Sequence, residues 1–151
     1  MDIATYWNQF KTKHPEVTTD QYDAFSLGFS DDHQTNNDLA YLIRDGVKTA
    51  TASAAELYEI DQEPLPKVGE YSVILDGQRQ PVCVIKETQV EITPLMQVSA
   101  EHAYREGEGT RTLEQWRSDH IAFFKKEYVE ANRPFNDNIP VVCETFKVIY
   151  R

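Results

Sequence analysis

The sequence has few cysteines, and their scarcity excludes two ways of holding a small protein together. Only Cys83 and Cys143 occur, far apart and each inside an apolar, strand-like run. This spacing predicts two buried thiols rather than a disulfide pair or a cysteine metal site. A chain of 151 residues is long enough to bury a hydrophobic core without such cross-links.

Basic residues are also scarce relative to acidic ones. The chain has 15 lysines and arginines against 25 aspartates and glutamates, a formal net charge of −10. This charge opposes sequence-independent binding to a phosphate backbone unless a local basic patch is present. No run of lysines or arginines offers such a patch, so long RNA is a disfavoured partner.

Long apolar runs are absent as well, and no segment reaches the length that spans a bilayer. Residues 1–5 lack the basic and apolar regions of a secretory signal. We therefore expect no membrane association and a cytoplasmic location.

Aromatic residues are plentiful, with seven Phe, eight Tyr and two Trp in a sequence that is 40% apolar. Disordered chains lack this much aromatic surface. We expect one packed domain over residues 1–151; the sequence does not indicate an oligomeric state.

Hydrophobic spacing and capping residues indicate the order of the elements. The predicted helices are 3–13 capped by Asp2, one from Asn36 or Asn37 to Gly46, 54–60, 99–105, and a long one opened by the capping box at 112–115. The predicted strands are 71–75 and 82–85 joined at Asp76-Gly77, a β region to Leu95, and 140–150. Helices, a strand cluster, a helix and a closing strand predict an α+β fold whose strands curl into a small barrel.

The stretch Gly46-Val47-Lys48-Thr49-Ala50-Thr51 places a lysine and a threonine just beyond a helix stop. On a regular strand Lys48 and Thr51 would point to opposite faces, so one site needs a turn or bulge. The later segment 106–109, with two glycines, predicts a loop that presents two carboxylates. His120 lies on the apolar face of the long helix and is interpreted as a hydrogen-bonded core residue.

Taken together, these motifs resemble the ASCH domain family, a small barrel family related to the PUA domains. Residues 46–51 followed by Ser53 resemble its Gly-x-Lys-x-Ala-Thr signature. The longer bacterial branch is matched by Glu106-Gly107-Glu108-Gly109, Leu113, Trp116-Arg117, His120, Phe123-Phe124 and Val142-Cys143-Glu144-x-Phe146. Thr110 departs from the pattern, because an aspartate is expected there.

The resemblance implies a PUA-like β-barrel with flanking helices and a cleft near the signature. The family has been proposed to bind RNA, while some members look like nucleoside amidohydrolases or ribonucleases. The amidohydrolase members use a lysine, a threonine and a glutamate, which correspond to Lys48, Thr51 and Glu106, with Glu108 as the fallback.

Such a set could cleave the amide of an acylated base such as N4-acetylcytidine, with Thr51 as nucleophile and Lys48 as its base. However, a carboxylate ~4 Å from an ammonium stabilises the charged pair by about 4 kcal/mol at an effective dielectric near 20 and raises the lysine pKa. We therefore prefer Glu106 as proton acceptor, with protonated Lys48 stabilising the oxyanion.

Two other interpretations use the same residues. In a binding module, Lys48 and Arg111 or Arg117 would contact phosphates while an aromatic ring stacks on a base, for a nucleoside, a nucleotide or short single-stranded RNA. Alternatively, Lys48 and Glu106 form an ion pair that only fixes the loop. The candidate substrate-binding residues are Ser53, Tyr58, Glu108, Arg111, Trp116 and Arg117. We expect no cofactor and no metal, since the 106–109 loop lacks calcium- or zinc-ligand spacing.

Overall fold

The computed structural model describes residues 1–29 and 31–151. Its helices are α1 (Ile3–Lys13), α2 (His33–Arg44), α3 (Ala55–Ile60), α4 (Ala100–Glu106) and α5 (Leu113–Glu130), with a 3-10 turn at Leu95–Gln97. Its strands are β1 (Asp23–Phe25), β2 (Ala50–Ala54), β3 (Tyr71–Leu75), β4 (Pro81–Pro94) and β5 (Pro140–Tyr150). None of the helices in these described ranges is long and apolar enough to cross a membrane.

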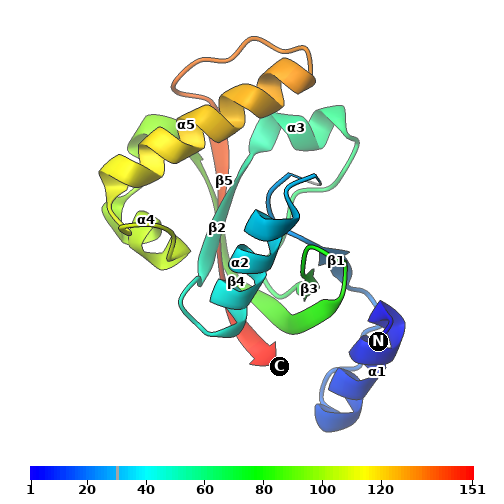
Figure 1. The fold of residues 1–151 in the computed structure, drawn as a ribbon. Coiled ribbons are helices and arrows are strands. Elements are labelled where there is room, and N and C mark those ends of the chain that lie inside the picture. The colour runs from blue at the N-terminus through cyan, green and yellow to red at the C-terminus, as the bar shows by residue number, and fades with distance from the viewer. Residues whose placement is uncertain (30) are drawn as a thin grey trace.

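The five strands form one sheet in the order β1-β3-β4-β5-β2, in which β1 pairs with β3 in parallel and the other pairs are antiparallel. The β4–β5 ribbon is the backbone of the molecule (Figure 1). Its register shifts at Val84/Ile85 and at Glu87/Gln89. Such irregularities bend and twist a strand pair, so the sheet curls into a half-barrel. The predicted α+β class with a curled sheet and flanking helices is confirmed.

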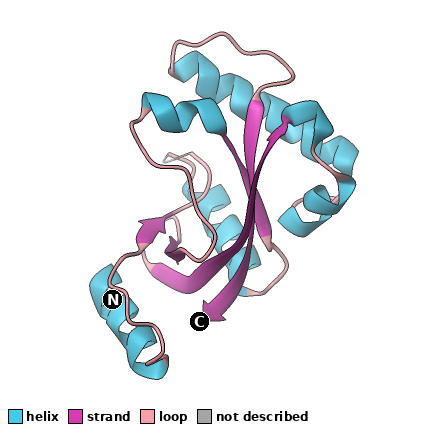
Figure 2. Ribbon diagram, turned by 180° about the vertical axis from the view of Figure 1, so that it is seen from behind, coloured by secondary structure: helices cyan, strands magenta, loops and turns pink. Residues whose placement is uncertain are grey.

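Helices cover this curled sheet through three apolar clusters. The first joins α4 and α5 to β2 and β5 around Trp116, Phe124 and Tyr128. The second seats α1 on β3 and β4 through Trp7 and Phe10. The third packs α2 against the middle strands. Both views place α1 at the opposite end of the molecule from α3 and α5 (Figures 1 and 2).

Several sequence predictions are confirmed closely. Asp2 caps α1 by accepting from the Thr5 amide, and Thr112 caps α5 by accepting from the Gln115 amide. Gly46 follows α2 with a φ of 78°, and β5 has the predicted bounds. Cys83 and Cys143 are free thiols, as expected.

Other boundaries were predicted wrongly. Helix α2 begins at His33, because Asp32 is the residue whose carboxylate caps the Thr35 amide. Asn36 therefore lies inside the helix and donates to the Phe29 carbonyl oxygen. The strand predicted at 82–85 is the start of the much longer β4, and the three-residue β1 was not predicted at all.

Candidate functional site

The chain turns sharply before β2, and this turn carries Lys48 into the interior. Beyond Gly46, the amides of Val47 and Lys48 both donate to the Leu42 carbonyl oxygen at the end of α2. The side chain of Lys48 is only 1% exposed, which is unusual for a lysine. A buried ammonium has to be paired, so its partners define the first part of the site.

Those partners come from the end of α4 and the loop after it. Lys48 Nζ lies 3.2 Å from Glu106 Oε1, 3.4 Å from the Glu106 carbonyl oxygen and 2.8 Å from Glu108 Oε2. The loop can approach so closely because residue 107 is glycine: a Cβ there would lie 2.5 Å from the Val47 carbonyl oxygen. Gly107 also has a φ of 71°, a conformation that favours glycine.

The Glu106 carboxylate accepts from further donors on α4 and α5. His102 Nε2 lies 2.8 Å and Trp116 Nε1 2.6 Å from Oε2, while His120 Nε2 lies 3.5 Å from Oε1. The other ring nitrogen of His120, Nδ1, is 2.8 Å from the Trp116 carbonyl oxygen. We call Lys48, His102, Glu106, Trp116 and His120 the buried charge network.

The expected flexible loop with two exposed carboxylates is therefore corrected by the structure. Glu106 is the last residue of α4 and is 1% exposed. Only Glu108, with 35% of its side chain exposed, lies in the loop and reaches solvent. His120 is hydrogen-bonded and largely buried, as the sequence predicted.

Electrostatics keeps both members of the central pair charged. Burial by itself disfavours the charge on each group. The attraction of Glu106 and Glu108 nevertheless raises the pKa of Lys48. Conversely, Lys48 and hydrogen bonds from His102 and His120 outweigh burial and lower the pKa of Glu106 well below the ordinary 4.5. These directions make Lys48 an ammonium and Glu106 a weakly basic carboxylate, which supports neither as the proton acceptor at neutral pH.

Thr51 lies in β2 directly opposite Glu144 of β5 and lines a different region, a cleft of about 500 Å³. Strand β2 begins at Ala50, so Lys48 precedes the strand and packs toward Glu106. Within the described part of the chain, Thr51 makes no side-chain hydrogen bond to Lys48 or Glu106. The structure therefore joins Lys48 to Glu106 and places Thr51 on the cleft wall.

The cleft is strongly acidic. Its lining includes the carboxyl groups of Asp23, Asp61, Glu63, Glu70, Glu87, Glu127 and Glu144. No lysine, arginine or histidine is among the lining residues in the described ranges. Burial and then the neighbouring Glu144 raise the pKa of Glu87 to about 9, and burial also raises the pKa of Glu144. At neutral pH Glu87 therefore keeps its proton.

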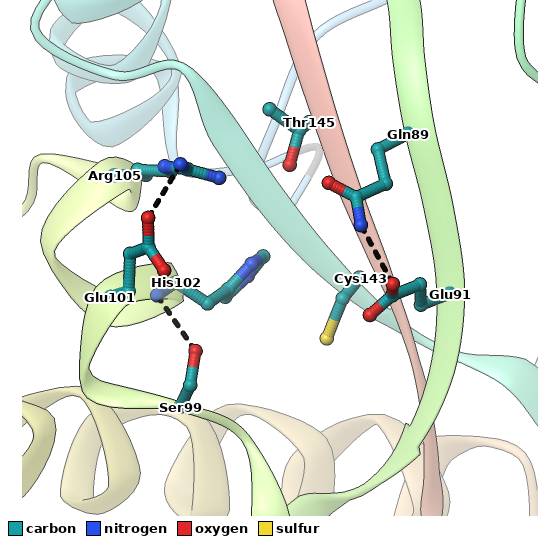
Figure 3. Close-up of a pocket in the computed structure, with 8 residues that line it drawn as sticks. All are labelled: Gln89, Glu91, Ser99, Glu101, His102, Arg105, Cys143 and Thr145. Carbon is teal, nitrogen blue, oxygen red and sulfur yellow. Dashed lines mark hydrogen bonds and ion pairs between the residues drawn. The ribbon is translucent and has the colours of Figure 1, made fainter.

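A second, smaller pocket of about 150 Å³ lies beside the buried charge network. Figure 3 shows His102 and Arg105 of α4 facing Cys143 of β5 and Gln89 of β4 across it. Arg105 is held by Glu101 at 2.6 Å. Because His102 also contacts Glu106, this pocket is the opening nearest to the network.

The predicted substrate-binding residues divide between these regions. Ser53 Oγ and the Tyr58 hydroxyl lie 2.8 Å apart and both line the cleft with Thr51. Glu108 and Trp116 belong to the surroundings of Lys48 and Glu106.

The two predicted phosphate-binding arginines are engaged elsewhere. The Arg111 guanidinium stacks 3.7 Å from the centre of the Tyr104 ring and donates to the Tyr104 and Val47 carbonyl oxygens. Arg117 donates to the Met96 carbonyl oxygen. Neither lines the cleft.

Sequence reasoning missed Glu87 and His102. Glu87 continues the buried alternation of Cys83 and Ile85 along β4, so a carboxylate in an inward position was the available signal. His102 precedes Glu106 by four residues, the spacing of neighbours on one helix face.

A curled half-barrel with flanking helices, a ligand-sized cleft and an adjoining lysine–carboxylate network defines a protein of the PUA-like class. More specifically, the chain belongs to the ASCH domain family, whose model matches residues 25–150.

Two solved structures are similar over nearly the whole chain. Protein EF3133 from Enterococcus faecalis V583, described under the family model DUF984, is 37% identical with a TM-score of 0.89, and the match covers 97% of this chain and 86% of that one. An ASCH domain from Lactobacillus crispatus JV V101 is 29% identical with a TM-score of 0.87, covering 97% and 93%. No curated protein matches the chain.

Proposed function

We propose that this protein is an amidohydrolase that removes the acyl group from a modified nucleoside such as N4-acetylcytidine, bound in the acidic cleft. The observation that carries the proposal is the position of Thr51, a hydroxyl on the wall of a cleft of about 500 Å³ and opposite the Glu144 carboxyl. Small-molecule sites in proteins have volumes of roughly 300–1,000 Å³.

In this reaction the Thr51 oxygen attacks the acyl carbon and its proton passes to a carboxylate. The carbon–nitrogen bond then breaks, the base leaves as the protonated amine, and water hydrolyses the acyl-threonine ester to a carboxylic acid. Glu144 is the better-placed proton acceptor, because it faces Thr51 across the strand pair and burial raises its pKa. Lys48 contributes its positive charge, which acts on Glu144.

The lining also supports a nucleoside rather than a phosphorylated ligand. A phosphate in the cleft would meet several carboxyl groups and no basic side chain among the described lining residues. Phe25, Leu57 and Phe123 supply apolar surface for a flat base. RNA binding through this cleft is therefore the less favoured alternative.

The test is incubation of the purified protein with N4-acetylcytidine and, separately, with short single-stranded RNA, followed by chromatography. Wild type is expected to release cytidine, and Thr51→Val is expected to lose this activity because it lacks the nucleophilic oxygen. Thr18→Val, at an exposed loop position, is the matched control and should act like wild type. Absence of turnover by wild type, or undiminished turnover by Thr51→Val, would refute the proposal; cleavage of RNA alone would favour a ribonuclease.

A further inference from the structure

Glu87 is an incompletely satisfied buried carboxyl group at the wall of the cleft. It is 4% exposed, and its Oε2 atom has no hydrogen-bond partner in the described part of the chain. Buried polar atoms are nearly always paired, because an unpaired one loses its hydration without compensation. Since Glu87 lines the cleft, a bound ligand can supply the missing partner.

A second carboxyl group accompanies it. Glu144 also lines the cleft and is only 7% exposed. Its charge is one of the causes that keep Glu87 protonated at neutral pH. The two carboxyls together therefore present one hydrogen-bond donor, the Glu87 hydroxyl, and several acceptor oxygens.

The charge of the surroundings restricts what the ligand can present to this pair. All ionisable side chains that line the cleft in the described ranges are carboxyls, apart from Tyr58. A ligand group that only accepts hydrogen bonds, or that is an anion, would be repelled there. A group with N–H donors next to one acceptor matches the pair.

We propose that Glu87 and Glu144 form the recognition end of the cleft and bind the amino-bearing edge of a phosphate-free heterocycle, such as the edge of cytosine or adenine. The ring nitrogen would accept from one carboxyl group while the exocyclic amino group donates to the other. Uracil carries a carbonyl oxygen in place of that amino group, and this oxygen would face an acceptor. The inference rests on the ligand site of the proposed function but not on hydrolysis.

The experiment is isothermal titration of the full-length protein at neutral pH with cytidine, uridine and cytidine 5′-monophosphate. Wild type is expected to bind cytidine at least about tenfold more tightly than uridine, as expected for the loss of one hydrogen bond to a charged group. Cytidine 5′-monophosphate is expected to bind more weakly than cytidine. Glu87→Gln and Glu144→Gln should each reduce cytidine affinity by about tenfold or more. Glu130→Gln, an equal charge change at an exposed position outside the cleft, is the matched control and should bind as wild type does.

Equal affinity for cytidine and uridine, tighter binding of the monophosphate, or unchanged affinity in both cleft variants would overturn the inference. The comparison of ligands uses wild type alone, so it decides the question even if a variant fails to fold. Cytidine selectivity without hydrolysis of N4-acetylcytidine would retain the inference and refute the amidohydrolase. Hydrolysis without selectivity would do the reverse, and failure of wild type to bind any nucleoside would refute both.

Discussion

Glu106 and Glu87 are both almost completely buried glutamates, with 1% and 4% exposure, yet they have opposite electrostatic states. Glu106 is surrounded by donors from three residues besides Lys48, and its pKa falls well below 4.5. Glu87 faces another carboxyl group and has an unpartnered oxygen, and its pKa rises to about 9. Partners rather than burial therefore decide which carboxylate stabilises the fold and which is available to a ligand.

The comparison changes how Lys48 should be tested. Lys48 connects the α2–β2 turn to the end of α4, so removing it disturbs the fold as well as any chemistry. Loss of turnover in a Lys48 variant would not by itself identify a catalytic residue. Substitutions on the cleft side are the cleaner tests of function.

The largest expected effect is that of Lys48→Met on stability. It leaves Glu106 buried without its main counter-charge, and breaking a buried ion pair in this way costs about 3–5 kcal/mol of unfolding free energy. Urea unfolding measures the loss. The matched control is Lys11→Met, which removes a pair with the well-exposed Asp20 and should cost less than about 1 kcal/mol. Equal costs for the two variants would show that the buried charge network does not stabilise the fold.

A smaller effect is expected from removing one donor of the network. Trp116→Phe removes the indole N–H that lies 2.6 Å from Glu106 Oε2 and should cost about 1–3 kcal/mol beyond the lost ring area. Trp7→Phe is the matched control, because Trp7 is also buried but its N–H has no partner in the described ranges. Thermal or urea unfolding of both variants gives the difference. If Trp7→Phe is the more costly change, the Trp116 hydrogen bond contributes little.

The fold was largely predictable where the signal is local. The cap residues Asp2 and Thr112 and the apolar strand 140–150 depend on short-range spacing, and the structure confirms them. Strand β1 was not predictable in this way, because three residues carry no period and their pairing with β3 is remote in sequence. The start of α2 was wrong because Asp32 competed with Asn36 as a cap.

The site was predictable only in part, for a related reason. The association of Lys48 with Glu106 followed from the family resemblance, and the structure brings these two together. Their burial depends on α5 supplying Trp116 and His120, which spacing along the chain does not reveal. Glu87 and Glu144 come from different strands, so their proximity required the β4–β5 register.

The most direct test of the contrast between the two glutamates is the unfolding free energy of Glu106→Gln and Glu87→Gln, each relative to wild type, from about pH 5 to pH 9. Glu106→Gln should cost about 3–5 kcal/mol throughout, because Glu106 is ionised in both folded and unfolded chains above about 4.5.

Glu87 should behave differently. The stability from its protonated form is fully present below about 4.5 and is lost as the pH rises to about 9, so wild type should lose stability relative to Glu87→Gln across this window. A large, pH-independent cost for Glu106→Gln beside a small, pH-dependent difference for Glu87→Gln is the predicted result. Equal and pH-independent costs for the two variants would contradict the account.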